Sequence, residues 1–279
     1  MSVRRKLLGG DPIVYAPGRA GRPNAFTGGT AGDLCAFCPG NEAETPPTIA
    51  SIPHPGGTGW MARAFANKFP AAEGHEVIVE SERQDDTFDT LRAPDLAVGL
   101  MLERYAAHPA AAHVALFKNQ GRLAGASLPH MHSQLIPLPF VPPRVAGEAL
   151  SFHDHCPLCD VASAGEPIAD DGVFTWLAPY GSVMAHQTWL VPKTHANEPR
   201  GDAGVAHLAA MLQRASRAML QIADAYNWSF TTFRCEPRGH WYVDLLPRLT
   251  TIAGFELGTG SFILIIDPAD TARRFRDLR

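Results

Sequence analysis

A chain of 279 residues can bury a large core, either as one domain or as two. Its net charge of −4, with 46% hydrophobic and 19% charged residues, is typical of a globular protein and argues against a non-specific nucleic-acid binder, which needs an excess of Lys and Arg. No stretch approaches the roughly 20 apolar residues that span a bilayer, and the N-terminus has no signal peptide, so we expect a cytoplasmic protein with no membrane partner.

Short β-rich runs and two amphipathic helices predict an α+β fold. A Pro-rich stretch, PLPFVPPR, indicates a stiff connector and predicts a division into residues 1–145 and 146–279. In chain order the predicted elements are a strand at 76–80, a helix from Pro94, a strand at 113–117, the connector at 137–144, strands at 173–177 and 187–191, a helix at 203–226 and a strand at 261–266.

Two segments of the second half repeat segments of the first half. HMHSQLIP, which begins at His130, aligns with HWYVDLLP, which begins at His240. In the same order, VESERQ (79–84) aligns with LVPKTH (190–195), and each half has a C-x-x-C pair upstream. This agreement in order indicates an internal duplication.

The second half carries a complete Cys₂His₂ set, formed by Cys156, Cys159, His195 and His240. This is the ligand type and number of a tetrahedral structural zinc site. Paired cysteines in a cytosolic chain more often bind metal or do redox work than form disulfides. The alternative interpretation is a redox cysteine pair beside ordinary polar histidines.

The first half offers an incomplete version of this set, with Cys35, Cys38 and His130. The alignment places Gln84 where the fourth ligand is expected, and an amide oxygen is a poor zinc ligand beside imidazole. Whether this first site holds metal therefore stays open. The other candidates for the fourth position are water, Asp85 and Asp86.

The segment LPHMHSQLIP places His130, His132 and Gln134 at alternate positions, which share one face if the segment is a strand. One imidazole can then bind metal while its neighbour does other chemistry. A neutral imidazole can attack phosphorus and carry a covalent intermediate. The amide of Gln134 can donate a hydrogen bond to a phosphate oxygen.

Eight short segments match one protein family, in order, along nearly the whole chain. They are APGRAGRPNAF (16–26), CAFCPGNEAETPP (35–47), FANKFP (65–70), FKNQGRLAGASLPHMHSQLIPLP (117–139), CPLCDV (156–161), WLVPKTH (189–195), HWYVDLLPRL (240–249) and AGFELGTG (253–260). Together they resemble the galactose-1-phosphate uridylyltransferases and their nucleotide-sugar phosphorylase relatives, in the histidine-triad superfamily. The KNQG and HSQ motifs are closer to those of the ADP-glucose phosphorylase-like branch.

This resemblance implies a duplicated histidine-triad-like fold, with mostly antiparallel sheets flanked by helices. It implies His132 as the catalytic nucleophile, with Gln134 beside it. Tyr242 and Asp244 stand at these two positions in the second copy, so we expect one active centre per chain. The resemblance also implies metal ligation by Cys35, Cys38 and His130, and substrate contacts from Arg19, Arg22, Asn67, Phe69, Asn119, Ser127 and Gln134. A turn residue and a core aromatic are the alternative interpretations of Asn67 and Phe69.

We therefore predict a hexose-1-phosphate nucleotidyltransferase of the uridylyltransferase or adenylyltransferase type. It would move a nucleoside monophosphate from a nucleotide sugar to a sugar 1-phosphate through a covalent nucleotidyl-His132. With inorganic phosphate as acceptor, the same residues would make a nucleotide-sugar or dinucleoside-polyphosphate phosphorylase, and with water a nucleotide hydrolase.

Two classes without this chemistry remain as alternatives: a non-catalytic nucleotide-binding descendant and a zinc-ribbon nucleic-acid binder. The acidic charge balance argues against the second class. The sequence leaves open the base, the acceptor and whether the chain forms a homodimer.

Overall fold

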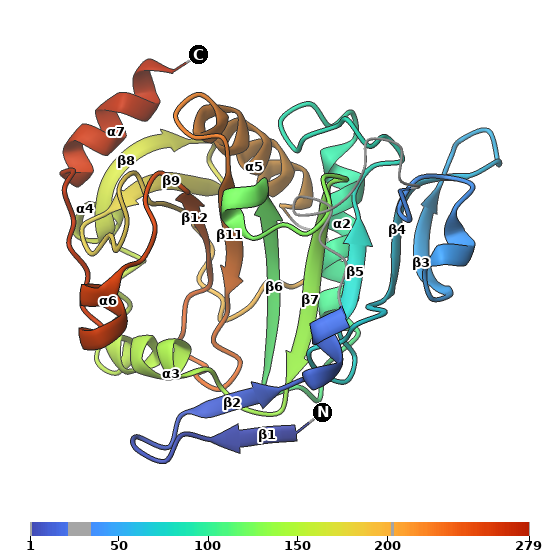
Figure 1. Cartoon of the computed structure of the whole chain (residues 1–279). Coiled ribbons are helices and arrows are strands. Elements are labelled where there is room, and N and C mark those ends of the chain that lie inside the picture. The colour runs from blue at the N-terminus through green and yellow to red at the C-terminus, as the bar shows by residue number, and fades with distance from the viewer. Residues whose placement is uncertain (1, 22–34, 202–203, 279) are drawn as a thin grey trace.

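An antiparallel sheet of ten strands runs through the chain, and a separate two-stranded hairpin precedes it (Figure 1). These are features of a computed structural model, which describes residues 2–21, 35–201 and 204–278. The hairpin pairs β1 (Ser2–Arg5) with β2 (Pro12–Tyr15). In spatial order the large sheet contains β3 (Thr48–Pro53), β4 (Trp60–Ala66), β5 (Glu76–Val79), β7 (His132–Leu138), β6 (His113–Gln120), β11 (Tyr226–Thr231), β12 (Tyr242–Pro247), β10 (Thr188–Pro192), β9 (Phe174–Pro179) and β8 (Gly165–Asp170).

The strand order of the large sheet is symmetric about its centre, where β6 pairs with β11. Outward from this pair, β7 matches β12, β5 matches β10, β4 matches β9 and β3 matches β8. The repeated segments HMHSQLIP and HWYVDLLP fall on or just before the matching strands β7 and β12. The predicted α+β class and duplicated antiparallel fold are thus confirmed. The division between residues 145 and 146 stays a prediction.

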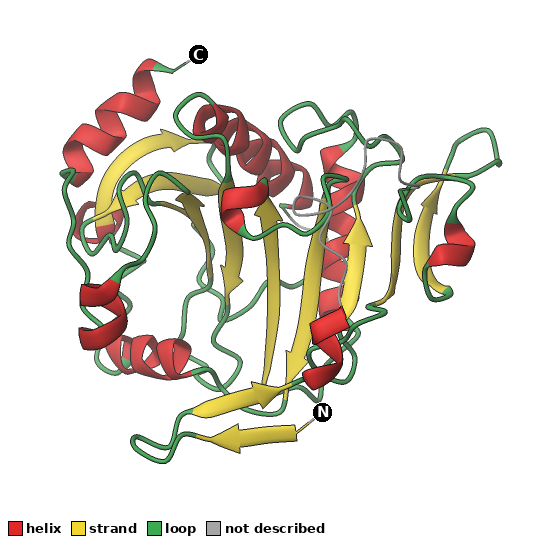
Figure 2. Ribbon diagram, in the orientation of Figure 1, coloured by secondary structure: helices red, strands yellow, loops and turns green. Residues whose placement is uncertain are grey.

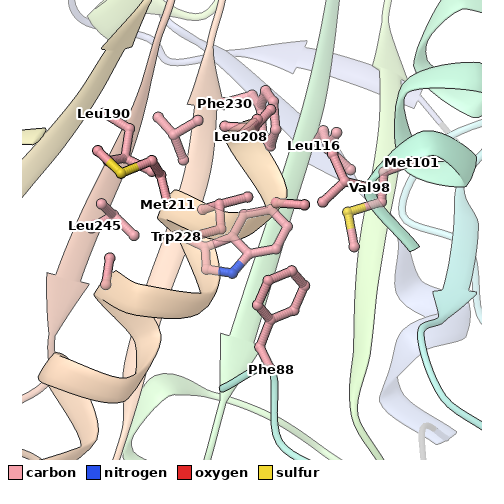
Figure 3. Close-up of a cluster of buried hydrophobic side chains, with 14 of the residues drawn as sticks. Phe88, Val98, Met101, Leu116, Leu190, Leu208, Met211, Trp228, Phe230 and Leu245 are labelled. Carbon is pink, nitrogen blue, oxygen red and sulfur yellow. The ribbon is translucent and has the colours of Figure 1, made fainter. Parts of the chain in front are cut away.

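Two helices cover one face of the sheet and bury the main core against it (Figures 2 and 3). Val98 and Met101 of α2 (Pro94–Ala106), Leu208 and Met211 of α5 (Val205–Leu220) and Trp228 of β11 are members of this core. Their helical spacing of three residues places each pair on one face of its helix, which explains why the amphipathic pattern predicts both helices.

The remaining helices are short, apart from α7, and none of the described helices has the length and apolar character needed to cross a membrane. They are α3 (Pro143–Ala149), α4 (Val161–Ala164), α6 (Gly254–Thr259), α7 (Pro268–Asp277) and the 3₁₀ turns η1 (Pro17–Gly21), η2 (Glu42–Glu44), η3 (Arg122–Ala124) and η4 (Leu150–Phe152).

Three predicted elements differ from the structure. The run at 261–266 is not a strand, because no described strand pairs with it and its Ile263 side chain is exposed; β-propensity forms a strand only where a neighbour supplies hydrogen bonds. The helix predicted at 203–226 begins at Val205 and ends at Leu220, and the apolar residues from Tyr226 belong to β11. The connector at 137–144 is shorter, because β7 extends to Leu138 and α3 begins at Pro143.

The strands predicted at 76–80, 113–117, 173–177 and 187–191 correspond to β5, β6, β9 and β10.

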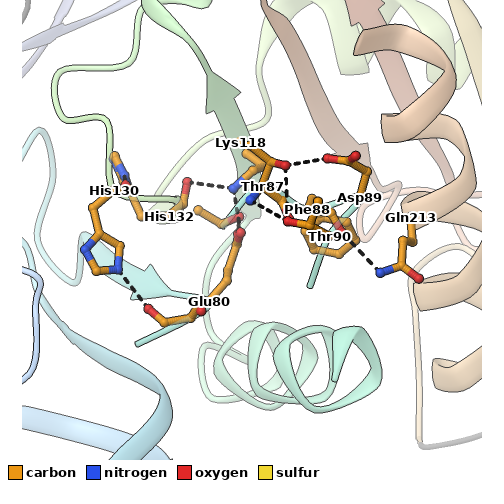
Figure 4. Close-up of polar contacts among 11 residues, drawn as sticks. Glu80, Thr87, Phe88, Asp89, Thr90, Lys118, His130, His132 and Gln213 are labelled. Atoms are coloured by element: carbon orange, nitrogen blue, oxygen red, sulfur yellow. Dashed lines mark hydrogen bonds and ion pairs between the residues drawn. The ribbon is translucent and has the colours of Figure 1, made fainter. Parts of the chain in front are cut away.

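A fully buried ion pair joins three strands on the helix-covered side of β7 (Figure 4). The Lys118 ammonium group of β6 binds the carboxylate of Glu80, just after β5, and the Ser133 hydroxyl of β7 donates to the same carboxylate. Burial lowers the pKa of Lys118, because water no longer stabilises its charge, and Glu80 acts in the opposite direction. The pair therefore ties β7 to its neighbours directly behind the predicted nucleophile.

Lys118→Met should lower the free energy of unfolding by about 3–5 kcal/mol, because it leaves the Glu80 carboxylate buried without a counter-charge. Urea unfolding followed by circular dichroism measures this loss. The double variant Lys118→Met/Glu80→Gln removes the orphaned charge and keeps an acceptor for Ser133, so it should regain more than half of the stability. A double variant no more stable than Lys118→Met would contradict this account.

Candidate active site

His132 begins β7, and its ring is held in one tautomer by the backbone. Its Nδ1 lies 2.8 Å from the carbonyl oxygen of His130, which can only accept a hydrogen bond. Nδ1 is therefore protonated, and in the neutral ring Nε2 carries the lone pair. The Phe37 ring packs edge-on against His132, with ring centroids 5.3 Å apart, and helps to shield this buried histidine from solvent.

Gln134 lies on the same face of β7 and is oriented by a second buried histidine. The Ala71 backbone N–H donates to Nδ1 of His75 over 3.0 Å, so the neutral ring carries its proton on Nε2. This Nε2 lies 3.2 Å from Oε1 of Gln134 and can donate to it. Because Oε1 of Gln134 faces His75, the NH₂ of the same amide points away from His75.

The predicted substrate contacts fall into two groups around this face. In the first, Arg19 donates to the carbonyl oxygen of Phe69 over 2.6 Å, and the Phe69 backbone N–H donates to Oδ1 of Asn67 over 2.8 Å. The amide nitrogen of Asn67 lies 3.1 Å from Nε2 of His75. Both atoms are donors when Nε2 carries the proton, so Asn67 is a neighbour of His75 and not its hydrogen-bond partner. The local turn at Asn67 is the one that its alternative interpretation expected. Arg22 lies outside the described residues.

The second group lies at the opposite edge of β7. Asn119 follows Lys118, which pairs with Ser133, and so lies next to His132 across the strands. Its Oδ1 accepts a hydrogen bond from Asn227 of β11 over 2.8 Å, which directs its NH₂ away from that contact. Ser127 is buried in the loop that precedes His130. The structure therefore gathers the described predicted residues on both sides of His132, and their roles in catalysis and binding stay predictions.

The first cysteine pair and His130 form a group of donors that could hold one metal ion. The sulfur atoms of Cys35 and Cys38 lie 3.4 and 3.6 Å from Nδ1 of His130. Nε2 of His130 donates to the carbonyl oxygen of Ser81 over 2.8 Å, so Nδ1 presents its lone pair to the two thiols.

The two thiols of this first group have different pKa values. Burial raises the pKa of Cys35, but its contacts with the His130 side chain and the Phe37 backbone N–H outweigh this effect and bring the pKa to about 7. Burial and the neighbouring Cys35 sulfur raise the pKa of Cys38 to about 11. Without metal the pair therefore carries at most one negative charge near neutral pH, and binding a cation requires loss of the second proton.

The second group is complete, as predicted, and repeats the geometry of the first. Nδ1 of His240 lies 3.4 and 3.6 Å from the sulfur atoms of Cys156 and Cys159, and its Nε2 donates to the carbonyl oxygen of Pro192 over 2.8 Å. His195 supplies the fourth donor, with its Nδ1 3.1 Å from Cys159. All four donor atoms lie within 4.8 Å of one another.

These separations fit a tetrahedral ion of zinc's size. Bonds of about 2.3 Å to sulfur and about 2.0–2.1 Å to nitrogen place sulfur and nitrogen roughly 3.6 Å apart. The sulfur-to-nitrogen separations of 3.4 and 3.6 Å in both groups agree with this value, and the 3.1 Å between Cys159 and His195 is shorter than it. Both groups can therefore accept such an ion with little movement.

In the second half, the position equivalent to the predicted nucleophile is closed by an ion pair. Asp244, which replaces Gln134 in the repeat, is buried and accepts from Arg144 over 3.1 Å and from Gln187 over 2.7 Å. Tyr242, which replaces His132, donates to Glu148 over 2.9 Å. These hydrogen bonds use the polar groups of Tyr242 and Asp244 within the protein. The expectation of one active centre per chain stays a prediction.

Four residues near His132 were missed by the sequence reasoning: Phe37, His75, Glu80 and Asn227. Phe37 lies inside the C-x-x-C pair, and that position was a usable signal. His75 and Asn227 contact the site from other strands or loops, and no local pattern marks such contacts. They become visible only when the sheet is assembled.

The chain resembles known proteins in both sequence and structure. No protein-family model matches the chain. ADP-glucose phosphorylase of Arabidopsis thaliana is 27% identical over 315 aligned positions, which cover 95% of this chain and 90% of that protein. The crystal structure of that enzyme with bound ADP-glucose superposes with a TM-score of 0.80 at 26% identity, covering 100% of this chain and 98% of that chain.

A second curated protein, galactose-1-phosphate uridylyltransferase of Thermotoga maritima, is 26% identical over 195 aligned positions, or 61% of each chain. Both relatives belong to the group that the motifs indicate, and the longer match lies on the phosphorylase-like branch. The chain is therefore a homologue of ADP-glucose phosphorylase and of galactose-1-phosphate uridylyltransferase.

Proposed function

We propose that the chain is a nucleotide-sugar phosphorylase, which transfers a nucleoside monophosphate from a nucleotide sugar through His132 to inorganic phosphate. The observation that carries this proposal is the hydrogen bond from Nδ1 of His132 to the His130 carbonyl oxygen. It places the lone pair on Nε2, and a neutral imidazole nitrogen is the nucleophile that a phosphohistidine intermediate requires.

The reaction has two balanced steps. Nε2 of His132 forms a bond to the α-phosphorus, and the bond from that phosphorus to the bridging oxygen breaks, so the sugar 1-phosphate leaves with the electron pair. An oxygen of inorganic phosphate then attacks the same phosphorus, and the phosphorus–nitrogen bond breaks. The nucleoside diphosphate departs, and Nε2 regains its lone pair. Amide groups of Gln134 and Asn119 would donate to the non-bridging oxygens in both steps.

Similarity to known proteins supports inorganic phosphate as the acceptor and an ADP-sugar as the donor. The Arabidopsis thaliana phosphorylase matches 95% of the chain, and its structure contains ADP-glucose. The uridylyltransferase reading made from the sequence remains the second candidate, supported by the shorter match to the Thermotoga maritima enzyme. The two readings share the first step and differ in the acceptor.

We also propose zinc as the metal. Two thiolates with one or two imidazoles are the donors that tetrahedral zinc prefers, and the separations within both groups suit it. Bound zinc would act as a structural ion. His130 would hold it through Nδ1, and the carbonyl of the same residue would hold His132. The ion would thus stiffen the backbone that orients the nucleophile.

The acceptor is tested by supplying ADP-glucose with inorganic phosphate, with galactose 1-phosphate, or with neither. We expect glucose 1-phosphate and ADP to form in equal amounts with phosphate. Glucose 1-phosphate should form at least tenfold more slowly with galactose 1-phosphate or with no acceptor. UDP-glucose with the same three acceptors tests the base. Faster turnover with galactose 1-phosphate and UDP-glucose would replace the phosphorylase by the second candidate.

His75 is expected to act as a positioning residue for Gln134. His75→Phe keeps a buried ring but removes the N–H that donates to Gln134. One neutral hydrogen bond contributes about 1–1.5 kcal/mol, so kcat should fall about tenfold while KM stays nearly unchanged. The test is a double-mutant cycle with Gln134→Ala. If His75 acts through Gln134, His75→Phe should have almost no further effect in that background. Additive losses would show that His75 has a general structural role instead.

A further inference from the structure

The two metal groups occupy matching places in the repeat and differ in one donor. Ser81 and Pro192 each accept a hydrogen bond from Nε2 of the group's histidine over 2.8 Å. Three residues after each of these lies the side chain at the fourth position, Gln84 in the first group and His195 in the second.

The amide oxygen of Gln84 lies beside Cys38, as His195 lies beside Cys159 in the second group. Oε1 of Gln84 lies 3.5 Å from the sulfur of Cys38 in the first group. In the second group, Nδ1 of His195 lies 3.1 Å from the sulfur of Cys159. A zinc–oxygen bond of about 2.1 Å with a zinc–sulfur bond of about 2.3 Å places oxygen and sulfur roughly 3.6 Å apart in a tetrahedron. The observed separation agrees with this value.

The neighbouring carboxylates are engaged elsewhere. Asp85 binds Arg83 over 3.0 Å and is largely exposed, and Asp86 accepts from the Ser81 hydroxyl and also binds Arg83. Glu82 binds His54. Among the described residues, no carboxylate joins the first group of metal donors.

We propose that Gln84 Oε1 is the fourth ligand of the first metal site, and that this site is consequently a weaker and faster-exchanging zinc site than the second. Both ligand sets carry the charge of two thiolates, so the sites differ in donor strength and not in net charge. An amide oxygen is a harder, weaker donor than imidazole for borderline-soft zinc. Gln84 is also exposed, which allows water to compete for its position.

The asymmetry gives the chain one exchangeable ion next to the nucleophile and one retained ion in the other half. His130 belongs to the exchangeable site, and its carbonyl oxygen accepts from His132. Loss of that ion removes one restraint on the backbone that orients His132, while the second half keeps its own ion. The availability of zinc would therefore act on the geometry around His132 before it acts on the stability of the fold.

The test is the rate of zinc release to a coloured chelator from the full chain, loaded with zinc and freed of excess metal. We expect two phases of equal amplitude, the faster at least about tenfold quicker than the slower. Cys35→Ser should lack the fast phase, which assigns it to the first site. A single phase for two ions, or a chain that binds only one zinc even at excess metal, would overturn the proposal.

Two reciprocal substitutions and one truncation test the ligand itself. Gln84→His should slow the fast phase to the rate of the second site, and His195→Gln should speed the slow phase to the rate of the first. Gln84→Ala should release zinc faster than the unchanged chain. Equal release from Gln84→Ala and the unchanged chain would mean that water completes the site, and the proposal would fail. None of these measurements needs a substrate, so their outcome is independent of the proposed reaction.

Discussion

His132→Gly should lower kcat for phosphorolysis of ADP-glucose by on the order of 10⁴-fold or more. The substitution removes the group proposed to form the covalent intermediate, and loss of a nucleophile in other covalent enzymes costs this much or more. KM should change little, because the amides of Gln134 and Asn119 remain. Steady-state formation of ADP and glucose 1-phosphate measures the effect.

The matched control is Tyr242→Phe, at the equivalent position of the second half. It removes the hydroxyl that donates to Glu148 but no group proposed to touch the substrate. Its kcat should stay within about threefold of the unchanged chain. Turnover by His132→Gly within tenfold of the unchanged chain would be incompatible with a covalent mechanism through this residue.

Cys156→Ser should lower the free energy of unfolding by on the order of 5 kcal/mol or more. The second metal group joins the turn at Cys156 and Cys159 to two distant segments, at His195 and His240, so a bound zinc ion would act as a cross-link. Zinc-finger peptides bind zinc with about 10–16 kcal/mol, and we expect less here because thiols of the unfolded chain also bind metal. Urea unfolding, with zinc content measured on the same sample, tests this value.

Cys235→Ser is the control for this experiment, because Cys235 is an exposed free thiol outside both metal groups. It should unfold within about 0.5 kcal/mol of the unchanged chain. A chelator should destabilise the unchanged chain and have a much smaller effect on Cys156→Ser. If Cys156→Ser retained both its zinc and its stability, the second group would not be a structural metal site.

Much of the fold follows from the sequence because the relevant signals are local or repeated. The pairs Met101/Tyr105 and Leu208/Met211 mark the core faces of two helices through their helical spacing. The repeat predicts matching strands, and β7 and β12 do occupy matching places in the sheet. Local propensity misleads at 261–266, where a β-rich run has no strand to pair with.

The site is less predictable, because its geometry depends on contacts between distant segments. The Cys₂His₂ set is visible in the sequence through the residue types that metal requires. The tautomer of His75 is not, since it depends on the Ala71 backbone amide and on Gln134, 59 residues further along the chain. The orientation of Gln84 likewise appears only in the folded chain, where its oxygen faces Cys38. Sequence patterns identify candidate donors, and the fold determines the direction in which each one points.

The intact-protein mass, measured after brief mixing with ADP-glucose in the absence of phosphate, tests the central claim most directly. We predict one adduct per chain with the mass of an adenylyl group, which is AMP less one water. It should be absent from His132→Gly and should disappear with release of ADP when phosphate is added. No adduct under these conditions, or an equal adduct on His132→Gly, would contradict transfer through His132.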